Sequence, residues 1–549
     1  MSVAAPELRA RRRARPRVLA GRLGLDRVEL GALLALAALS VAILAGLLLR
    51  GRPLSGADGL LAADELQYFA WIRDAGEHIL IGNRFDLAPG PRSFLHPGFL
   101  LSGLVHRVVG LSVPAAYLLW KPVAVGLTFF ACRAYVRRLL PPGGQRHVAL
   151  ILALFAIMPA SSFVTWSGWG GKPREYTFAF ITGEMWSGQY LWGYLMTALA
   201  VFLMPVVLLA IERWRVERRR STLAWAAVGT LVVCWLQPWQ GATLAVIVVG
   251  VEAWRFARTR ERPPLALAVV PLAAAIPSAY YFALATWDPS WKLAGEVNAA
   301  GAQAEWSWPW WAMVLVVLPL AAPAVLAYRG RAASWQEMAL RLWPFAALAV
   351  YLQPAGTFPY HSFQGLTLPL AILAVQGISG RWRPRRALVV AALFVMIVPG
   401  LASRVQAAAH NVHAGADPYF VFGGEVRALK WLESDPRPGG VLASAYAGYM
   451  IPSRTGREVY VGALSWSPDW GTRGRRADAL FEGRMTGEPA RRFVLSTGAR
   501  FLFGDCRPGV RDLSGELAGL VERVQRFGCA TVYVLSPRPG QARVGPPDA

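Results

Sequence analysis

The stretch LGALLALAALSVAILAGLLL, residues 30–49, is an unbroken run of apolar and small residues. A helix needs about 20 such residues to cross the roughly 30 Å hydrocarbon core of a bilayer. The segment before the run is basic and contains Arg9, Arg11, Arg12, Arg13, Arg15, Arg17, Arg22 and Arg27. Because positively charged flanks stay in the cytoplasm, we predict an uncleaved signal-anchor helix, with the residues that follow it outside.

The composition of the whole chain indicates a membrane protein with many spans. Of 549 residues, 55% are hydrophobic, only 16% are charged and 23 are tryptophan, and the mean hydropathy is +0.36. The net charge of +24 is spread over short clusters between apolar runs, so no nucleic-acid partner is expected. The preference for arginine over lysine is typical of a GC-rich bacterial genome, and we therefore expect a bacterial plasma membrane.

The loops predict the topology of the chain. About eleven apolar segments follow one another, and the loops between them alternate between arginine-rich and arginine-poor, as the positive-inside rule requires. The arginine-poor loops are rich in aromatic residues, glycine and proline and are predicted to be outside: 165–190, 237–241, 287–309 and 354–365. An odd number of crossings places the C-terminus outside. The spans at 222–235 and 342–352 are short, so some helices are expected to stop below the outer surface and leave a cavity.

These features divide the chain into four parts. The prediction is a basic cytoplasmic arm at 1–27, a transmembrane bundle at 28–402 with a long first outer loop at 50–113, an outer α/β domain at 403–536 and a disordered tail at 537–549. The fold class is thus a polytopic α-helical membrane protein with a C-terminal extracytoplasmic α/β domain.

The pattern within the outer domain predicts strands and helices. Short apolar runs predict strands at 441–443, 459–461, 501–503 and 531–535, and apolar periodicity predicts helices at 425–433, 477–485 and 513–526. Cys506 and Cys529 both fall in this domain, where an oxidising compartment permits a disulfide. Their spacing does not fit a zinc site.

An acidic pair, Asp64-Glu65, opens a helical stretch in the first outer loop, and Tyr68 and Arg73 follow at helical spacing. One interpretation is a capping box, with Asp64 as N-cap and a glutamine three residues later, at the start of a helix that runs to about residue 80. The other is a functional site, because a helix places Asp64, Glu65 and Tyr68 on one face. The apolar residues at 69–72 are expected to rest on the membrane surface.

Residues 64–68, Asp-Glu-Leu-Gln-Tyr, resemble the Asp-Glu-x-x-Tyr motif of the GT-C superfamily of membrane glycosyltransferases. This superfamily includes the protein O-mannosyltransferases and the aminoarabinose transferases of lipid A, and its motif lies soon after the first span. The predicted layout of spans, long first outer loop and C-terminal domain is also similar. Gln67 stands where the lipid A enzymes can have a basic residue. The resemblance implies a GT-C-like fold, a polyprenyl-phosphate sugar donor and the role of base for the aspartate.

The chemistry of glycosyl transfer fits these residues. A hydroxyl acceptor is a poor nucleophile, so a carboxylate must take its proton as it attacks the anomeric carbon. We assign this role to Asp64, with Glu65 as a second catalytic candidate and Tyr68 as a substrate contact. The N–H groups at the start of the helix are expected to keep Asp64 ionised. Direct displacement inverts the anomeric centre, and a nucleophilic Glu175 or Glu184 is the alternative.

The leaving phosphate needs fixed positive charge or backbone donors. Candidates for substrate binding come from three outer loops: Arg73 and Arg84; Lys172, Arg174 and Glu175; and His361 with Gln364. The glycines of the second loop, 166–176, permit close backbone approach, and its cations can meet a phosphate. The alternative for that loop is an interfacial aromatic belt with snorkelling cations. For His361 and Gln364, the alternative interpretation is that they are solvated loop residues.

Two further features bear on ligands. The stretch 466–470, Trp-Ser-Pro-Asp-Trp, suits stacking on a sugar, although core packing or docking on the bundle is the favoured interpretation. No residue is assigned as a metal ligand, because no cluster has the required number of ligands. A divalent cation held by Asp64, Glu65 and one loop acid is left open.

We therefore predict a glycosyltransferase that moves a sugar from a polyprenyl-phosphate donor to an extracytoplasmic glycan, lipid or protein acceptor, with membrane lipids around it. Two other classes stay open. A transporter or flippase for a lipid-linked glycan would use the same cavity without chemistry at Asp64. A membrane-anchored glycan-binding scaffold would concentrate its function in the C-terminal domain.

Overall fold

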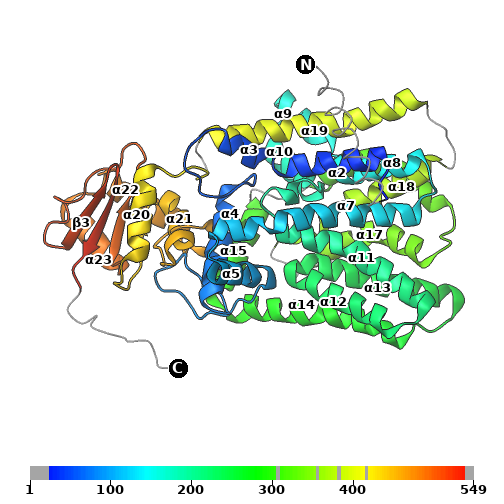
Figure 1. The fold of residues 1–549 in the computed structure, drawn as a ribbon, viewed down its shortest axis with the longest axis horizontal. Coiled ribbons are helices and arrows are strands. Elements are labelled where there is room, and N and C mark those ends of the chain that lie inside the picture. Colours follow the sequence, from blue (N-terminus) through cyan, green and yellow to red (C-terminus); the bar gives the residue numbers. More distant parts are fainter. Residues whose placement is uncertain (1–23, 305–308, 354–357, 380–384, 415–417, 538–549) are drawn as a thin grey trace, which may run out of the picture.

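The computed structural model describes residues 24–304, 309–353, 358–379, 385–414 and 418–537. The predicted basic arm at 1–27 and tail at 537–549 lie almost wholly outside the described residues. The chain folds into a bundle of long helices and a smaller C-terminal domain that packs against one end of it (Figure 1). We call that end of the bundle the domain end.

Helices long and apolar enough to cross a membrane form the bundle. Six such segments lie in the described residues: Val113–Leu139 (α6 and α7), Leu195–Glu217 (α11), Leu265–Trp287 (η2 and α14), Trp310–Arg329 (α16 and η3), Pro359–Ser379 (η4 and α18) and Arg386–Val412 (within α19). Two bent pairs raise the number to eight: α2 (Arg27–Ser40) with α3 (Ala42–Leu48), and α8 (Gly144–Phe155) with α9 (Pro159–Ser167). The protein is therefore a polytopic membrane protein.

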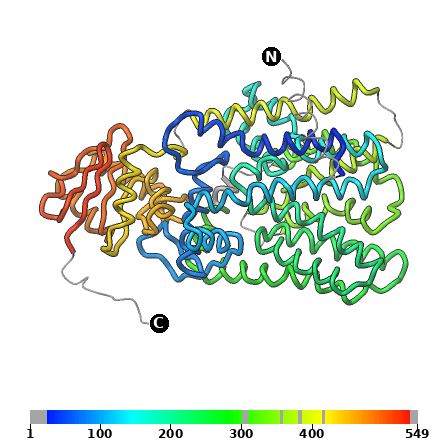
Figure 2. The backbone as a smooth tube through the Cα atoms, in the orientation of Figure 1, coloured from blue at the N-terminus to red at the C-terminus, as the bar shows by residue number. Residues whose placement is uncertain are grey.

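Three further helices pack among these spans: α12 (Arg220–Leu236), α13 (Pro238–Thr259) and α17 (Trp335–Leu352). Each of these helices is too short or too polar to be identified as a membrane span by itself. The predicted number of about eleven spans therefore stays a prediction. The last helix is longer than expected. It continues from Arg386 to Ala414, past the predicted end at residue 402, and runs along the bundle to the domain end (Figure 2).

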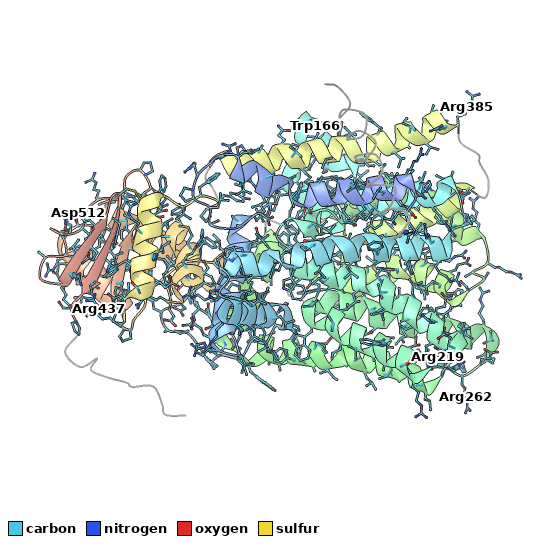
Figure 3. The ribbon with its side chains drawn as sticks, viewed as in Figure 1. Trp166, Arg219, Arg262, Arg385, Arg437 and Asp512 are labelled. Atoms are coloured by element: carbon cyan, nitrogen blue, oxygen red, sulfur yellow. A yellow bond between two sulfur atoms is a disulfide. The ribbon has the colours of Figure 1, made fainter. Side chains whose placement is uncertain are left out.

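Arginines gather at the end of the bundle away from the C-terminal domain. Figure 3 shows Arg219, Arg262 and Arg385 there, each in a loop between long helices. These loops are among those that the sequence predicts to be cytoplasmic. The C-terminal domain and the arginine-rich loops thus lie at opposite ends of the helices, as the predicted topology requires.

The first loop after α3 contributes two helices to the domain end, α4 (Ala62–Glu77) and α5 (Pro97–Val109). They cross where Gly76 meets Gly103, and a Cβ on Gly103 would lie within 3 Å of the Gly76 backbone. The N-cap of α4 is Leu61. The capping-box interpretation of Asp64 is therefore wrong, because Asp64 lies inside the first turn.

The apolar residues of α4 do not rest on a membrane surface as predicted. Phe69, Trp71 and Ile72 are at most 7% exposed. Phe69 packs on Tyr117, and Trp71 packs on Phe99 of α5 and on Trp466 of the C-terminal domain, whose helix α21 (Ala445–Thr455) also packs against α4. Periodicity alone does not distinguish a face buried by a distant domain from one buried by lipid.

The C-terminal domain contains a four-stranded sheet in the order β1-β2-β4-β3. Strands β1 (Val441–Ala443) and β2 (Phe501–Gly504) are parallel, whereas β4 (Ala530–Leu535) pairs antiparallel with β2 and with β3 (Val521–Phe527). Leu442 and Leu502 face the core formed with α22 (Trp470–Phe481) and α23 (Gly487–Thr497). Their neighbours in β1 and β2 belong to the large core that continues into the bundle.

The predictions for this domain are partly confirmed. Strands β1, β2 and β4 and helix α20 (Gly423–Ser434) lie where expected. The predicted strand at 459–461 is a single bridge from Val459 to Val441, and α22 begins and ends earlier than the predicted helix at 477–485. The predicted helix at 513–526 is wrong, because its second half is β3. The apolar residues of β3 recur every third position, a spacing that imitates a helix.

Cys506, just after β2, and Cys529, in the turn before β4, form a disulfide with a Cα–Cα distance of 5.0 Å. The bond joins residues that are 23 positions apart. It ties the turn before β4 to the loop after β2, next to helix α20, whose Glu425 accepts a hydrogen bond from the Cys506 backbone N–H.

We predict that replacing both Cys506 and Cys529 by serine lowers the stability of the C-terminal domain by about 2–4 kcal/mol, because the unfolded chain loses a cross-link. Thermal unfolding of the purified protein with and without reductant measures this effect. Reductant should lower the Tm of the wild type and leave that of the double variant unchanged. Equal Tm values for all four samples would contradict the prediction.

Candidate functional site

A cavity of about 1990 Å³ opens at the domain end, between the bundle and the C-terminal domain. Its wall includes Leu236 and Gln237 at the end of α12, and Val350 and Gln353 at the end of α17. These are the two spans that the sequence identifies as short. The predicted cavity is present and the ends of both helices line it, but α17 has 18 residues and is longer than the segment 342–352.

Asp64 points into this cavity from the first turn of α4. Its Oδ2 accepts a hydrogen bond of 2.6 Å from the hydroxyl of Tyr194, which precedes α11. Burial raises the pKa of Asp64 above its ordinary value, and the Tyr194 hydrogen bond and the charge of nearby His361 oppose that rise. Desolvation therefore outweighs the helix-end N–H groups that were expected to keep Asp64 ionised.

Tyr68 lies one turn after Asp64 and lines the same cavity. Its ring stacks on Phe99 at 5.4 Å and meets the edge of Tyr194 at 6.4 Å. Burial and the neighbouring carboxylates hold the pKa of the Tyr68 hydroxyl well above its ordinary value. Tyr68 is thus a neutral wall residue that fixes the position of Tyr194 from the other side.

Four polar side chains that line the cavity are connected to one another: Glu184, His361, Gln364 and Gln237. His361, in η4 (Pro359–Phe363), has its Nδ1 3.0 Å from Glu184 Oε2 and 2.9 Å from Gln364 Nε2. Gln237 Nε2 in turn donates to Gln364 Oε1 over 3.0 Å. Since these contacts engage Nδ1, the other ring nitrogen, Nε2, is the one that can meet a ligand. Both predicted residues, His361 and Gln364, therefore lie at the cavity.

Arg404 is a cavity residue that the sequence analysis missed. It lies in α19, is 8% exposed and donates from Nη2 to Thr182 Oγ1 over 2.9 Å and to the carbonyl of Ala179. Glu184 is close enough to interact with its charge. An arginine inside an apolar helix is itself a signal of function. Hydropathy alone predicts that the last span ends at residue 402, which places Arg404 in the C-terminal domain.

Some residues of the loop at 166–176 fit the predicted ligand-binding role, and others fit the interfacial aromatic belt. Lys172 and Glu175 line the cavity, and their side chains form an ion pair of 3.0 Å in which Lys172 is 90% exposed. Arg174 instead covers the rings of Trp169 and Trp311, at 4.5 and 5.3 Å. Arg174 fits the aromatic belt and does not line the cavity.

Three other candidates from the first loop lie away from the cavity. Glu65 turns to the opposite side of α4 and accepts hydrogen bonds from the backbone N–H groups of Asp58 and Gly59. Arg73 pairs with Glu433 of the C-terminal domain at 2.7 Å, and Arg84 pairs with Asp74 and with Glu458 of that domain. The two arginines fasten the domain to the loop, so neither meets a phosphate in the cavity.

The part of the cavity next to the C-terminal domain is aromatic. Trp466, in η5 (Leu464–Trp466), packs its ring at 5.2 Å from Trp71 of α4 and at 5.3 Å from Trp291 of α15 (Pro289–Ala304), and Phe94 lies 4.9 Å from Trp291. These four residues are called the aromatic side of the cavity. The favoured interpretation of Trp466, docking on the bundle, is confirmed.

Charge is distributed unevenly over the cavity. Among the described lining residues, the charged side chains come from α4, from α19 and from the segments around α10 (Gly171–Met185) and η4. We call Asp64, Glu184, His361 and Arg404 the charged side of the cavity. On the aromatic side, burial lowers the pKa of His96 to about 3, which keeps its ring neutral.

A shared cation at Asp64 and Glu65 does not fit the structure. The two carboxylates point to opposite sides of α4, since Asp64 faces the cavity and Glu65 the backbone of Asp58 and Gly59. In the described ranges, one group of three acidic or histidine side chains comes close enough for a metal, Asp74, Glu77 and His78. Asp74 is already paired with Arg84, and none of the three lines the cavity.

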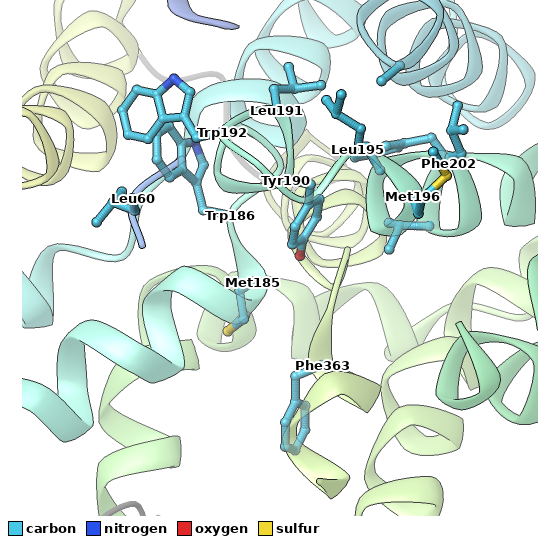
Figure 4. Packing of buried hydrophobic residues seen from close by; sticks show 14 of the residues in the cluster. Leu60, Met185, Trp186, Tyr190, Leu191, Trp192, Leu195, Met196, Phe202 and Phe363 are labelled. Atoms are coloured by element: carbon cyan, nitrogen blue, oxygen red, sulfur yellow. The ribbon is translucent and has the colours of Figure 1, made fainter. Parts of the chain in front are cut away.

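The core beside the cavity positions Tyr194. Trp186 and Trp192 pack edge to face at 5.1 Å, and both are nearly fully buried around η1 (Gln189–Leu191), as Figure 4 shows. The indole of Trp192 donates to the carbonyl of Leu39 over 2.7 Å. The turn that leads into Tyr194 is therefore fixed to the break in the first span.

Comparison with known proteins gives matches in structure and none in sequence. No family model matches the chain, and no curated protein matches it. Among solved structures, ArnT from Cupriavidus metallidurans bound to undecaprenyl phosphate aligns with 94% of this chain and 100% of its own, at 12% identity and a TM-score of 0.45.

A second match is the oligosaccharyltransferase AglB from Archaeoglobus fulgidus. Its apo form aligns with 87% of this chain and 69% of its own, at 13% identity and a TM-score of 0.47. The structure of its complex with an inhibitory peptide and a dolichol-phosphate aligns with 86% of this chain and 69% of its own, at 15% identity and a TM-score of 0.41. These structural neighbours of the chain are GT-C glycosyltransferases, the superfamily whose motif residues 64–68 resemble.

Proposed function

We propose that this protein is a membrane glycosyltransferase that transfers a sugar from a polyprenyl-phosphate donor to a hydroxyl acceptor, with Asp64 as the general base. One observation carries the proposal. A carboxylate held by Tyr194 and two cationic or cation-forming side chains, Arg404 and His361, share one large cavity at the domain end. Proton acceptor and phosphate-binding groups are the two elements that this reaction requires.

The charged side of the cavity is the proposed place of the donor phosphate. The hydrogen bonds of Arg404 to Ala179 and Thr182 both use Nη2, so the rest of its planar guanidinium can bind a phosphate. His361 presents Nε2, which is a donor when Nδ1 accepts the hydrogen bond of Gln364 Nε2. The polyprenyl tail would leave the cavity between the apolar helices.

The reaction follows from this placement. The acceptor oxygen attacks the anomeric carbon while its proton passes to Asp64. The bond from that carbon to the phosphate oxygen breaks, and the electron pair leaves with the phosphate, whose charge Arg404 and His361 stabilise. Displacement from the face opposite the phosphate inverts the anomeric centre. We place no step on a divalent cation, because the described residues of the cavity offer no ligand set for one.

The aromatic side of the cavity is the proposed entrance for the acceptor. Helix α4 carries Asp64 on the charged side and Trp71 two turns later on the aromatic side, so an acceptor lying along α4 reaches the base. Asn298 accepts a hydrogen bond of 2.9 Å from Ser465, which adds a neutral polar group beside the tryptophans. Aromatic and neutral polar groups favour an uncharged acceptor such as a glycan over a phosphorylated one.

We further propose that the domain end faces away from the cytoplasm of a bacterial plasma membrane. The arginine-rich loops at the opposite end of the bundle support this orientation. A disulfide in the C-terminal domain supports it too, because disulfides persist in oxidising compartments. The acceptor would then be an envelope component outside the membrane.

We predict that Asp64→Asn lowers kcat by at least about 100-fold and leaves donor binding intact, because asparagine keeps the shape of the side chain and loses the proton acceptor. Mass spectrometry of polyprenyl-phosphate sugars, with native lipid extract in proteoliposomes, measures turnover. Glu77→Gln, on the same helix and away from the cavity, is the matched control. Equal turnover in Asp64→Asn and wild type would refute the assignment of the base.

We also predict how the rate of glycosyl transfer by the wild type depends on pH. Asp64 must be ionised to accept a proton, and its pKa is raised by burial. The rate should therefore fall as pH drops through a value above the ordinary aspartate pKa. An acid limb at or below the ordinary value would mean that the group controlling the rate is not Asp64.

We predict that Arg404→Gln weakens binding of undecaprenyl phosphate by about tenfold or more, because a charge-assisted hydrogen bond contributes about 1.5–3 kcal/mol. Native mass spectrometry of nanodisc-reconstituted protein titrated with this lipid measures the affinity. Arg386→Gln, at the other end of α19, is the control and should bind like wild type. Equal weakening in both variants would show a nonspecific effect of charge on the helix.

A further inference from the structure

Two carboxyl groups and one ammonium group are buried together behind α4. Asp58, Glu65 and Lys121 are each at most 5% exposed. Lys121 Nζ, on α7 (Trp120–Leu139), donates to Asp58 Oδ2 and to the backbone carbonyls of Ser40 and Leu191, each of the latter over 2.9 Å. With both carboxyl groups ionised, the group would carry a net negative charge in a dry interior, and the described ranges contain no second cation paired with it.

Each carboxyl group has one oxygen without a hydrogen-bond partner. These are Asp58 Oδ1 and Glu65 Oε1. The two residues are close neighbours, because Glu65 Oε2 accepts the backbone N–H of Asp58 over 2.8 Å. Two ionised carboxylates buried next to each other repel, whereas a single proton shared between their unpartnered oxygens would form one hydrogen bond and give both oxygens a partner.

We propose that Asp58 and Glu65 share one proton, with Asp58 as the ionised partner of Lys121 and Glu65 as the protonated acid. Together the three groups form a neutral cluster that positions the first turn of α4, and hence Asp64. Glu65 is then a positioning residue rather than a catalytic one. This role explains why it follows Asp64 in the motif and yet faces away from the cavity.

The second oxygen of Glu65 is compatible with this assignment. Oε2 accepts the backbone N–H groups of Asp58, at 2.8 Å, and of Gly59. A protonated carboxyl accepts such bonds through its carbonyl oxygen and donates through its hydroxyl. Burial and the charge of Asp58 also raise the pKa of Glu65 well above its ordinary value.

The cluster is joined to the catalytic carboxylate by close packing. A Cβ on Gly193 would lie 2.8 Å from Glu65 Cδ, and one on Gly59 would lie 2.8 Å from Glu65 Oε2, so only glycines leave room for this side chain. Tyr194, the residue after Gly193, holds Asp64 by its hydroxyl. Moving Glu65 therefore displaces the turn that presents the hydrogen-bond partner of Asp64.

The proton makes the stability of the protein depend on pH in a defined direction. A carboxyl group whose pKa is raised in the folded state stabilises the fold at low pH, and that contribution is lost as pH rises towards the folded-state pKa. The other titratable groups nearby are Lys121 of α7, Tyr117 of α6 (Val113–Leu118) and Tyr68 of α4. Burial holds the pKa of the Tyr68 hydroxyl well above its ordinary value, so this phenol stays neutral in the tested range.

The test compares Glu65→Gln with wild type by thermal unfolding from about pH 5 to about pH 9. Glutamine copies the protonated acid and cannot ionise. We expect Glu65→Gln to fold and to lose less stability than wild type as pH rises, by up to about tenfold in the unfolding equilibrium per pH unit. The exposed Glu77→Gln on the same helix should follow wild type. A Tm profile of Glu65→Gln that runs parallel to wild type would overturn the proposal, since it would mean that Glu65 is ionised in the fold.

Two more variants complete the test. Asp58→Asn should lower the Tm at every pH, because Lys121 then loses its carboxylate. If Asp58→Asn instead lost less stability than wild type as pH rises, the assignment would be reversed and the proposal overturned. Donor turnover should stay within about threefold of wild type in Glu65→Gln and fall in Glu65→Ala. A stable Glu65→Gln without turnover would overturn the positioning role. The unfolding data need no substrate, so they stand even if the proposed glycosyl transfer is wrong.

Discussion

The structure depends on one buried ammonium group. From the first turn of α7, Lys121 reaches three acceptors: a carbonyl at the break of the first span, a carbonyl before α11 and the carboxylate of Asp58 in the first loop. Leaving a charge of this kind unpaired in a dry interior costs several kcal/mol. The first span, the turn before Tyr194 and the loop that leads into α4 are therefore held together at one point, directly behind Asp64.

Around that point the cavity has two chemically different sides, and α4 connects them. Its first turn carries the carboxylate, and its later turns carry the tryptophan that meets the C-terminal domain. The C-terminal domain closes the aromatic side and is fastened to the first loop by Arg73 and Arg84. The same helix thus connects the C-terminal domain to the proposed base, which gives a physical reason why the proposed membrane enzyme has such a domain.

Much of this arrangement is predictable from local sequence signals. The apolar run at 30–49, the arginine-rich loops and the two short spans predict a membrane bundle with a cavity at one end, and the motif at 64–68 predicts the carboxylate in it. Long-range contacts are not predictable in the same way. From the sequence, Arg73 and Arg84 are reasonable phosphate ligands. In the structure they pair with Glu433 and Glu458, more than 350 residues later in the chain. Arg404 was missed because the extent of the last helix is set by packing rather than by hydropathy, and β3 because its apolar spacing imitates a helix.

The central claim is that the base and the donor phosphate share the charged side of one cavity. A cryo-EM structure of the wild type in nanodiscs with undecaprenyl phosphate tests it directly. We expect phosphate density in contact with Arg404 and His361, in the same cavity as the Asp64 carboxylate. Phosphate density at the arginine-rich end of the bundle, or in a pocket separated from Asp64 by protein, would contradict it.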